Sequence, residues 1–235
     1  MRPDPYAWTL HLEASLAILA LAAAYTIGVR RLELERWRAA AFAGGIALLL
    51  ATAITPVDAL SYHVLTVHLL QNVVLAEWAP ALLVLGLPPA LADRFRPHPL
   101  VTLPLWIGTY FVWHLPPLYD AALRHDALLH LEHASYLAAG VLLWWPVLHG
   151  DRPPQQRAAY LFAGFVFASP LGLLLALLPD AVYETYESGF LDWGLTAIED
   201  QQIAGITMAG EQAIVFFAAF AYFFFRFLAA EERAD

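Results

Sequence analysis

Long apolar runs separated by short polar connections dominate the chain. Seven runs are long enough for a helix that crosses a bilayer core of about 30 Å, which takes about 20 mostly apolar residues. They cover residues 7–29, 39–57, 61–87, 99–118, 127–149, 157–178 and 197–227. The pattern predicts an all-α, polytopic membrane protein in which residues 1–235 form one domain of seven transmembrane helices.

Arginine is unevenly divided between the two sides of this predicted bundle. Ten arginines lie in the connections after the first, third and fifth runs and at the C-terminus, whereas only Arg2 and Arg124 lie on the other side. Cytoplasmic connections carry an excess of positive residues, so the N-terminus is predicted outside and the C-terminus in the cytoplasm. The charges beside the first run follow it, which favours a membrane helix over a cleaved signal peptide.

Composition narrows the chemistry that such a bundle can perform. Hydrophobic residues make up 60% of the chain, and lysine and cysteine are both absent. Without lysine there is no Schiff base, which excludes a retinal protein. Without cysteine there are no disulfides and no thiolate metal sites. The net charge of −9 includes no basic patch, so the lipid bilayer is an expected partner and nucleic acid is not.

Histidines gather on one side of the predicted topology. Seven of the nine lie outside or at the outer ends of the runs: His11, His63, His68, His114, His125, His130 and His133. Ionisable groups within membrane helices usually face the bundle interior and mark a functional site. The layer therefore predicts a shared site near the outer face, formed by the third, fourth and fifth helices.

The spacing within two of these helices supports a metal site. His130 and His133 are three residues apart, about 60° around a helix, and could reach a single ion. Glu132 lies between them and could either accept a hydrogen bond from a ligating imidazole or face lipid headgroups. His68 and Asn72 share another helix face, whereas His63 lies about 140° away from His68 if the helix is continuous.

The last run adds a polar stripe on one face. Asp200, Ala204, Met208 and Glu211 recur along nearly one line, and the thioether of Met208 close to imidazoles would favour Cu(I). Glu211 and, on the third run, Glu77 lie near the middle of the membrane. They are interpreted either as a proton relay or as protonated carboxyls that hydrogen-bond between helices.

The connection at 179–196 is acidic and aromatic and is predicted to lie outside. Tyr and Trp are typical of the membrane interface, so one interpretation places its rings at headgroup level. The alternative is a docking surface for a cationic partner.

Three stretches resemble the bacterial CtaG family of cytochrome c oxidase assembly factors. They are HLLQN at 68–72 with APALLVLGLPP at 79–89, WHLPPLYDAALRHDALLHLEHASYLAAGVLLWWPV at 113–147, and DQQIAGITMAG at 200–210. The resemblance implies a seven-helix protein of the bacterial cytoplasmic membrane, without enzymatic activity, that delivers copper to the oxidase. The implied partners are oxidase subunits and an extracytoplasmic copper donor. The residues that it implicates are His68, His114, His130, His133, Asp200 and Met208.

One position departs from the family pattern. The family reads His-x-x-Gln-His in the third helix, and this chain has Asn72 where the second histidine would stand. Asn is a poor copper ligand, so either His63 substitutes for it, or His68 acts with ligands from other helices, or binding is lost.

Two further functions remain open at this point. Histidines from facing helices could ligate haem in a membrane electron carrier or enzyme. Glu77 and Glu211 could serve a proton-coupled transporter, although the internal repeats and broken helices typical of transporters are not evident. The hypothesis that the sequence favours is a carrier of copper, as Cu(I), at the extracytoplasmic face.

Overall fold

The computed structural model describes residues 3–8 and 10–233, and in these residues helices account for all regular structure except one isolated bridge between Phe190 and Leu195. Two long helices, α1 (Leu12–Val29) and α2 (Arg36–Ile54), come first along the chain, and two others, α10 (Pro154–Leu177) and α11 (Ala197–Glu231), come last. The third predicted run is built from α4 (Leu65–Val73), the π-helical turn η1 (Val74–Trp78) and α5 (Ala79–Gly86). The remaining helices are α3 (Pro56–Ser61), α6 (Pro89–Ala92), α7 (Pro99–Trp113), α8 (Pro116–Arg124) and α9 (Asp126–Leu148), with 3-10 turns η2 (Glu184–Tyr186) and η3 (Leu191–Trp193).

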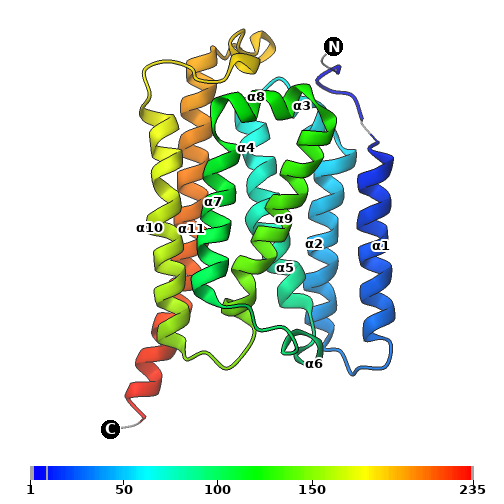
Figure 1. The fold of residues 1–235 in the computed structure, drawn as a ribbon, viewed down its shortest axis with the longest axis vertical. Coiled ribbons are helices and arrows are strands. Elements are labelled where there is room, and N and C mark those ends of the chain that lie inside the picture. The colour runs from blue at the N-terminus through cyan, green and yellow to red at the C-terminus, as the bar shows by residue number, and fades with distance from the viewer. Residues whose placement is uncertain (1–2, 9, 234–235) are drawn as a thin grey trace.

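Each of the seven predicted runs coincides with a helix, and these helices run side by side along the long axis (Figure 1). Five are long and apolar enough to cross a membrane: α1, α2, the α4–α5 segment, α10 and α11. The other two are α7, which has 15 residues, and α9, which has 23. The all-helical, membrane-protein part of the prediction is therefore supported.

Proline and hydrogen bonding shift several of the predicted boundaries. The first helix begins at Leu12 rather than at residue 7, because His11 is extended and its side chain binds Asp58. The run at 99–118 ends at Trp113, since Pro116 holds Leu115 in the extended region and starts α8 in a new direction. Arg2, which entered the orientation argument, lies outside the described residues.

The π-helical turn lies where α9 crosses closest to the third run. Gly140 of α9 packs against the backbone of Ala76, where a Cβ atom would collide with the carbonyl oxygen. Trp106 of α7 donates its Nε1–H to the same carbonyl at 3.3 Å. The turn is wholly buried apart from Trp78, and it directs Glu77 into the bundle. π-helical turns inside helices often occur at functional sites.

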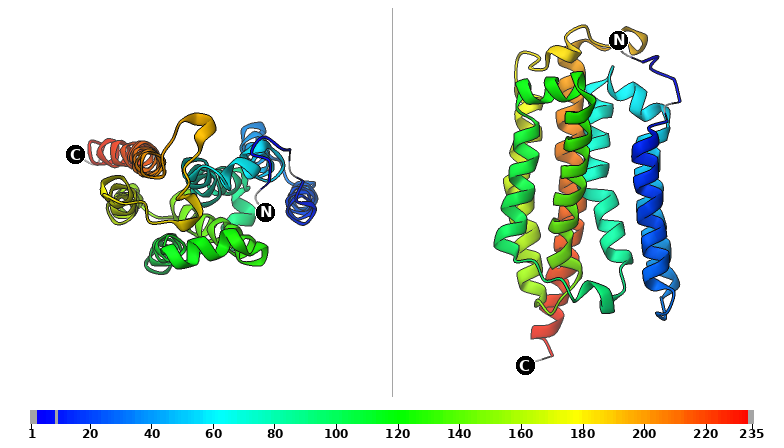
Figure 2. Two further views of the ribbon diagram at one scale, coloured as in Figure 1. Left: turned by 90° about the horizontal axis from the view of Figure 1, so that it is seen from above. Right: turned by 45° about the vertical axis from the view of Figure 1, so that its right-hand side comes forward.

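The outer end of the bundle is closed by α8 and by residues 179–196, which lie across the helix ends (Figures 1 and 2). Asp120 of α8 accepts hydrogen bonds from the backbone of Glu184 and Thr185, and Tyr186 donates to the carbonyl of Ser61 at 2.6 Å. The aromatic side chains of this connection are therefore largely turned inward as a cap. Tyr183, Tyr186 and Phe190 are buried and Trp193 is exposed, so an interfacial position fits only Trp193, and a docking surface for a cationic partner stays a prediction.

Helix α1 contrasts with this closed end. Ser15 is the one buried residue within its described span, and the helix stands beside α2 at the edge of the bundle (Figure 2). The rest of the bundle is tightly packed, with α10 and α11 meeting at Gly172 and Gly205, where either added Cβ would collide with the opposite backbone. Small residues at such crossings let membrane helices approach closely.

Candidate metal site

His68 forms the centre of a buried polar cluster below the cap. It lies on α4, is 1% exposed, and directs its Nε2 to within 3.7 Å of the Glu132 carboxylate on α9. Asn72, one turn further along α4, donates its amide to the same Glu132 oxygen at 3.0 Å. The expectation that Glu132 turns toward an imidazole of a neighbouring helix, rather than toward headgroups, is confirmed.

Two further histidines approach this centre from other helices. The ring of His133 on α9 lies 6.5 Å from the ring of His68, measured between centroids. His114 follows the last residue of α7, and its Nδ1 lies 2.7 Å from the Tyr110 carbonyl oxygen. Because a carbonyl can only accept, Nδ1 carries the proton, and the lone pair of His114 is on Nε2.

Several nitrogens of this cluster have no hydrogen-bond partner among the described residues. They are both ring nitrogens of His68, Nε2 of His114 and Nε2 of His133, together with the second oxygen of Glu132. Leaving a buried polar atom without a partner costs about 1–3 kcal/mol, so such groups usually serve a purpose. Imidazole nitrogens and a carboxylate are ligand types that suit copper or zinc.

The number of ligands within reach sets a limit on this site. In the described part of the chain, no group of three or more His, Asp or Glu side chains lies close enough to hold one ion. The closest histidine pair of the cluster is His68 with His133, and Glu132 supplies negative charge beside it. In the described residues the structure therefore shows a histidine pair with a neighbouring carboxylate, and no complete coordination sphere.

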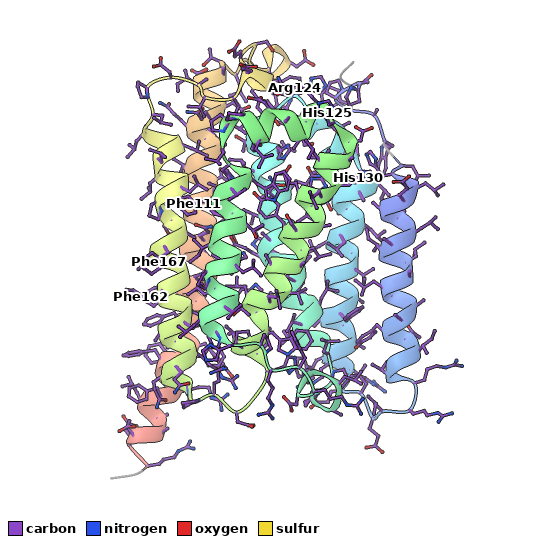
Figure 3. All side chains as sticks on the ribbon, in the orientation of Figure 1. Phe111, Arg124, His125, His130, Phe162 and Phe167 are labelled. Atoms are coloured by element: carbon purple, nitrogen blue, oxygen red, sulfur yellow. The ribbon has the colours of Figure 1, made fainter. Side chains whose placement is uncertain are left out.

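His130 does not join His133 as the sequence spacing suggested. His130 is exposed at the outer end of α9, on the side of α1 (Figure 3), and its ring meets that of His11 at 6.4 Å. Helical spacing gives the angle between two side chains but not the neighbours that each one meets. The two histidines consequently meet different neighbouring rings, although both line one cavity at the side of the bundle.

The other predicted ligands are engaged elsewhere. Asp200 accepts hydrogen bonds from the backbone N–H groups of Leu65 and Thr66, at 2.6 and 3.0 Å, and so caps the start of α4. His63 precedes α4, and its Nε2–H donates to the Pro3 carbonyl at 2.7 Å. Met208 is buried in the apolar core of α11, about 12 Å along the helix from Asp200. Asp200 and His63 are therefore hydrogen-bonded elsewhere, and His63 does not replace the family histidine at position 72. The role of Met208 as a ligand stays a prediction.

Tyrosines that the sequence did not single out enclose the cluster. Tyr119 of α8 packs on the His68 ring at 5.0 Å, and Tyr136 places its hydroxyl 3.3 Å from Nδ1 of His114. In the cap, Tyr183 donates to the His114 carbonyl at 3.1 Å. Burial raises the pKa of Tyr183, which keeps this hydroxyl protonated as a donor. Their only sequence signal was position: Tyr119 lies in the WHLPPLYDAAL stretch, Tyr136 three residues after His133, and Tyr183 in the outer connection.

A second polar group lies deeper in the bundle. Gln212 of α11 donates its amide to Glu77 at 3.2 Å and to the Tyr110 hydroxyl at 2.7 Å, while Trp78 donates to Glu211. Glu77 and Trp78 are consecutive residues, so the two carboxyl groups belong to the same polar group. Tyr110 thus connects both groups, since its carbonyl binds His114 and its hydroxyl binds Gln212.

Comparison with known proteins agrees with the resemblance noted in the sequence. The model of a family described as cytochrome c oxidase caa3 assembly factor (Caa3_CtaG) matches residues 23–230. The match includes His68, His114 and His133 and excludes His11. No solved structure matches the chain.

Three mycobacterial proteins without an assigned function are also similar. Those of Mycobacterium bovis and Mycobacterium tuberculosis are each 25% identical over 228 residues, covering 82% of this chain and 34% of their own length. That of Mycobacterium leprae is 25% identical over 201 residues, covering 72% of this chain and 30% of its own. The chain thus spans about a third of the length of these relatives.

Proposed function

The chain belongs to the cytochrome c oxidase caa3 assembly factor family, and we propose that it carries copper, as Cu(I), to such an oxidase in the site around His68, His114 and His133. The observation that carries this proposal is the set of buried imidazole nitrogens without hydrogen-bond partners. Buried polar nitrogens are usually paired, as the amide nitrogen of Gln71 is with the Thr52 carbonyl.

The types of ligand in this site suit a copper ion that the protein binds and later releases. Neutral imidazoles bind Cu(I), while the absence of cysteine leaves out the thiolates that would hold it most tightly. Glu132 offsets the positive charge of the ion, and its hydrogen bond from Asn72 holds the carboxylate in place. In this proposal Asn72 is not a copper ligand but positions Glu132. The protein acts as a carrier of copper, not as an enzyme.

We further propose a topology of seven crossings with the N-terminus outside. The N- and C-terminal ends of the described chain lie at opposite ends of the bundle, as an odd number of crossings requires (Figure 1). The excess of arginine on the side of the C-terminus makes that side cytoplasmic. The copper site then lies near the extracytoplasmic face of the bacterial cytoplasmic membrane, where an oxidase subunit and an extracytoplasmic copper donor could reach it.

Copper binding by the purified protein tests the proposal. After loading with Cu(I) under reducing conditions, the protein should retain a stoichiometric amount of copper, and His68→Ala with His133→Ala should abolish it. His98→Ala is a matched control, because His98 lies at the opposite end, where its side chain caps α7. Full copper retention in the double variant would overturn the proposal, and a Soret band in an optical spectrum would indicate haem as the ligand instead.

A further inference from the structure

The copper site is closed toward the outer aqueous face. His68 and Glu132 are each 1% exposed and His114 is 4% exposed. Tyr119 and Tyr183 stack 4.1 Å apart, between centroids, above the histidines, and Asp120 fastens the cap through the backbone of Thr185 at 2.9 Å. An ion arriving directly from above would have to displace this packed aromatic layer.

A cavity at the side of the bundle does reach the site. It has a volume of about 330 Å³, and one of the residues that line it is His133. Its walls come from α1, α2 and α9 and are mostly small or aliphatic, including Ala14, Ala17 and Ala134. His133 therefore has one side toward the ring of His68 and another toward this cavity.

The cavity is also lined by side chains that can bind a cation, namely His11, His130, Glu13 and Asp58. The rings of His11 and His130 meet edge to face with centroids 6.4 Å apart. Nδ1 of His130 lies 3.9 Å from the Glu13 carboxylate, and Nε2 of His11 lies 2.8 Å from that of Asp58. Both His130 and Glu13 are exposed, so an ion can reach them before it reaches His133.

We propose that His11 and His130 form a loading site for Cu(I), from which the ion passes through the cavity between α1 and α9 to His133 and His68. The inference rests on the proposed copper-carrier function and adds the route by which the cargo arrives. Glu13 and Asp58 attract the cation, and the imidazoles exchange it. His130 and His133 are one helical turn apart, so the transfer covers about 5 Å along α9.

The rate of copper loading tests this route separately from copper binding itself. Stopped-flow loading of the full-length protein with a Cu(I) chelate as donor should be slowed on the order of tenfold by His11→Ala with His130→Ala, while the final copper content stays that of the wild type. His125→Ala is the matched control, because this exposed histidine at the outer end does not line the cavity (Figure 3). It should load at the wild-type rate.

A second variant blocks the route without touching a histidine. Ala17→Trp places a large ring in the cavity from the loosely packed α1, and it should slow loading while the melting temperature is retained. Wild-type loading rates in both the histidine and the tryptophan variants, with copper still bound at equilibrium, would overturn the route and leave the carrier function standing. Absence of copper from the wild-type protein would instead overturn the carrier function, and the route with it.

Discussion

Two buried polar layers lie at different depths of the same apolar bundle, and they differ in how their hydrogen bonds are used. In the outer layer, His68, His114 and His133 leave ring nitrogens without a partner among the described residues. In the deeper layer, Gln212 bridges Glu77 and Tyr110 between three helices. The two layers therefore differ in the kind of atom left without a partner within the described chain: mainly imidazole nitrogens in the outer layer, and oxygens of Glu77, Glu211 and Gln212 in the deeper layer.

The two layers also differ in the chemical groups that they offer to a ligand. In the deeper layer, the carboxyl groups of Glu77 and Glu211 accept hydrogen bonds from Gln212 and Trp78, as polar groups do between membrane helices. In the outer layer, neutral imidazoles beside a single carboxylate offer nitrogen lone pairs, which are ligands for soft metal ions.

The largest expected effect comes from removing the central imidazole of the outer layer. His68→Leu should abolish copper binding, yet leave the melting temperature unchanged or higher, because it replaces two unpartnered buried nitrogens by an apolar side chain of similar volume. Copper analysis and thermal unfolding in the same detergent measure both. A large drop in melting temperature would instead show that the outer layer holds the helices together, as the deeper layer does.

Removing the bridging amide of the deeper layer should have the opposite result. Gln212→Leu deletes the donor to Glu77 and Tyr110 and should lower the free energy of unfolding by about 1–3 kcal/mol, with copper content unchanged. Gln202→Leu, an exposed position on the same helix, is the control for the change in polarity. Loss of copper in the Gln212 variant would mean that the two layers act as one site through Tyr110.

A smaller effect is expected at the position that departs from the family pattern. Asn72→His adds an imidazole one turn from His68 and beside Glu132, and it should tighten Cu(I) binding by about tenfold, or about 1.4 kcal/mol. Competition with a Cu(I) chelator measures the affinity. Weaker binding would show that the amide of Asn72, by holding Glu132, contributes more than an added ligand does.

The smallest effect concerns a histidine whose nitrogen is already used. His149, at the inner end of α9, donates its Nε2–H to the Val84 carbonyl at 2.8 Å, and burial lowers its pKa. Since the unfolded chain binds the proton more readily, stability should fall as the pH drops below the ordinary value of about 6.5.

His149→Ala should reduce this pH dependence and leave copper binding unchanged. Unfolding curves measured between pH 7.5 and 5.5, a range chosen to bracket about 6.5, compare the variant with the wild type. If stability changes equally with pH in the variant and the wild type, His149 does not take up a proton on unfolding. Loss of copper would contradict the distinction between histidines with and without a hydrogen-bond partner.

The sequence predicted the helices well because bilayer crossing imposes long apolar runs, which depend on local composition. It also named His68, His114 and His133, which the structure brings near Glu132 and Tyr119, although their role as metal ligands stays a prediction. It could not show that His130 meets His11 while His133 meets His68, because that depends on where α1 and α4 lie in space. The tyrosines were missed for the same reason, since Tyr183 reaches His114 from a position 69 residues further along the chain.

Asp200 has a consequence for how the protein is made. The carboxylate that caps α4 comes from the last helix, 135 residues after the backbone N–H of Leu65 that it binds. While the ribosome is still synthesising α11, the N-terminal end of α4, one turn before His68, lacks this cap. If the site around His68 carries copper as proposed, it can therefore mature only after α11 has been inserted.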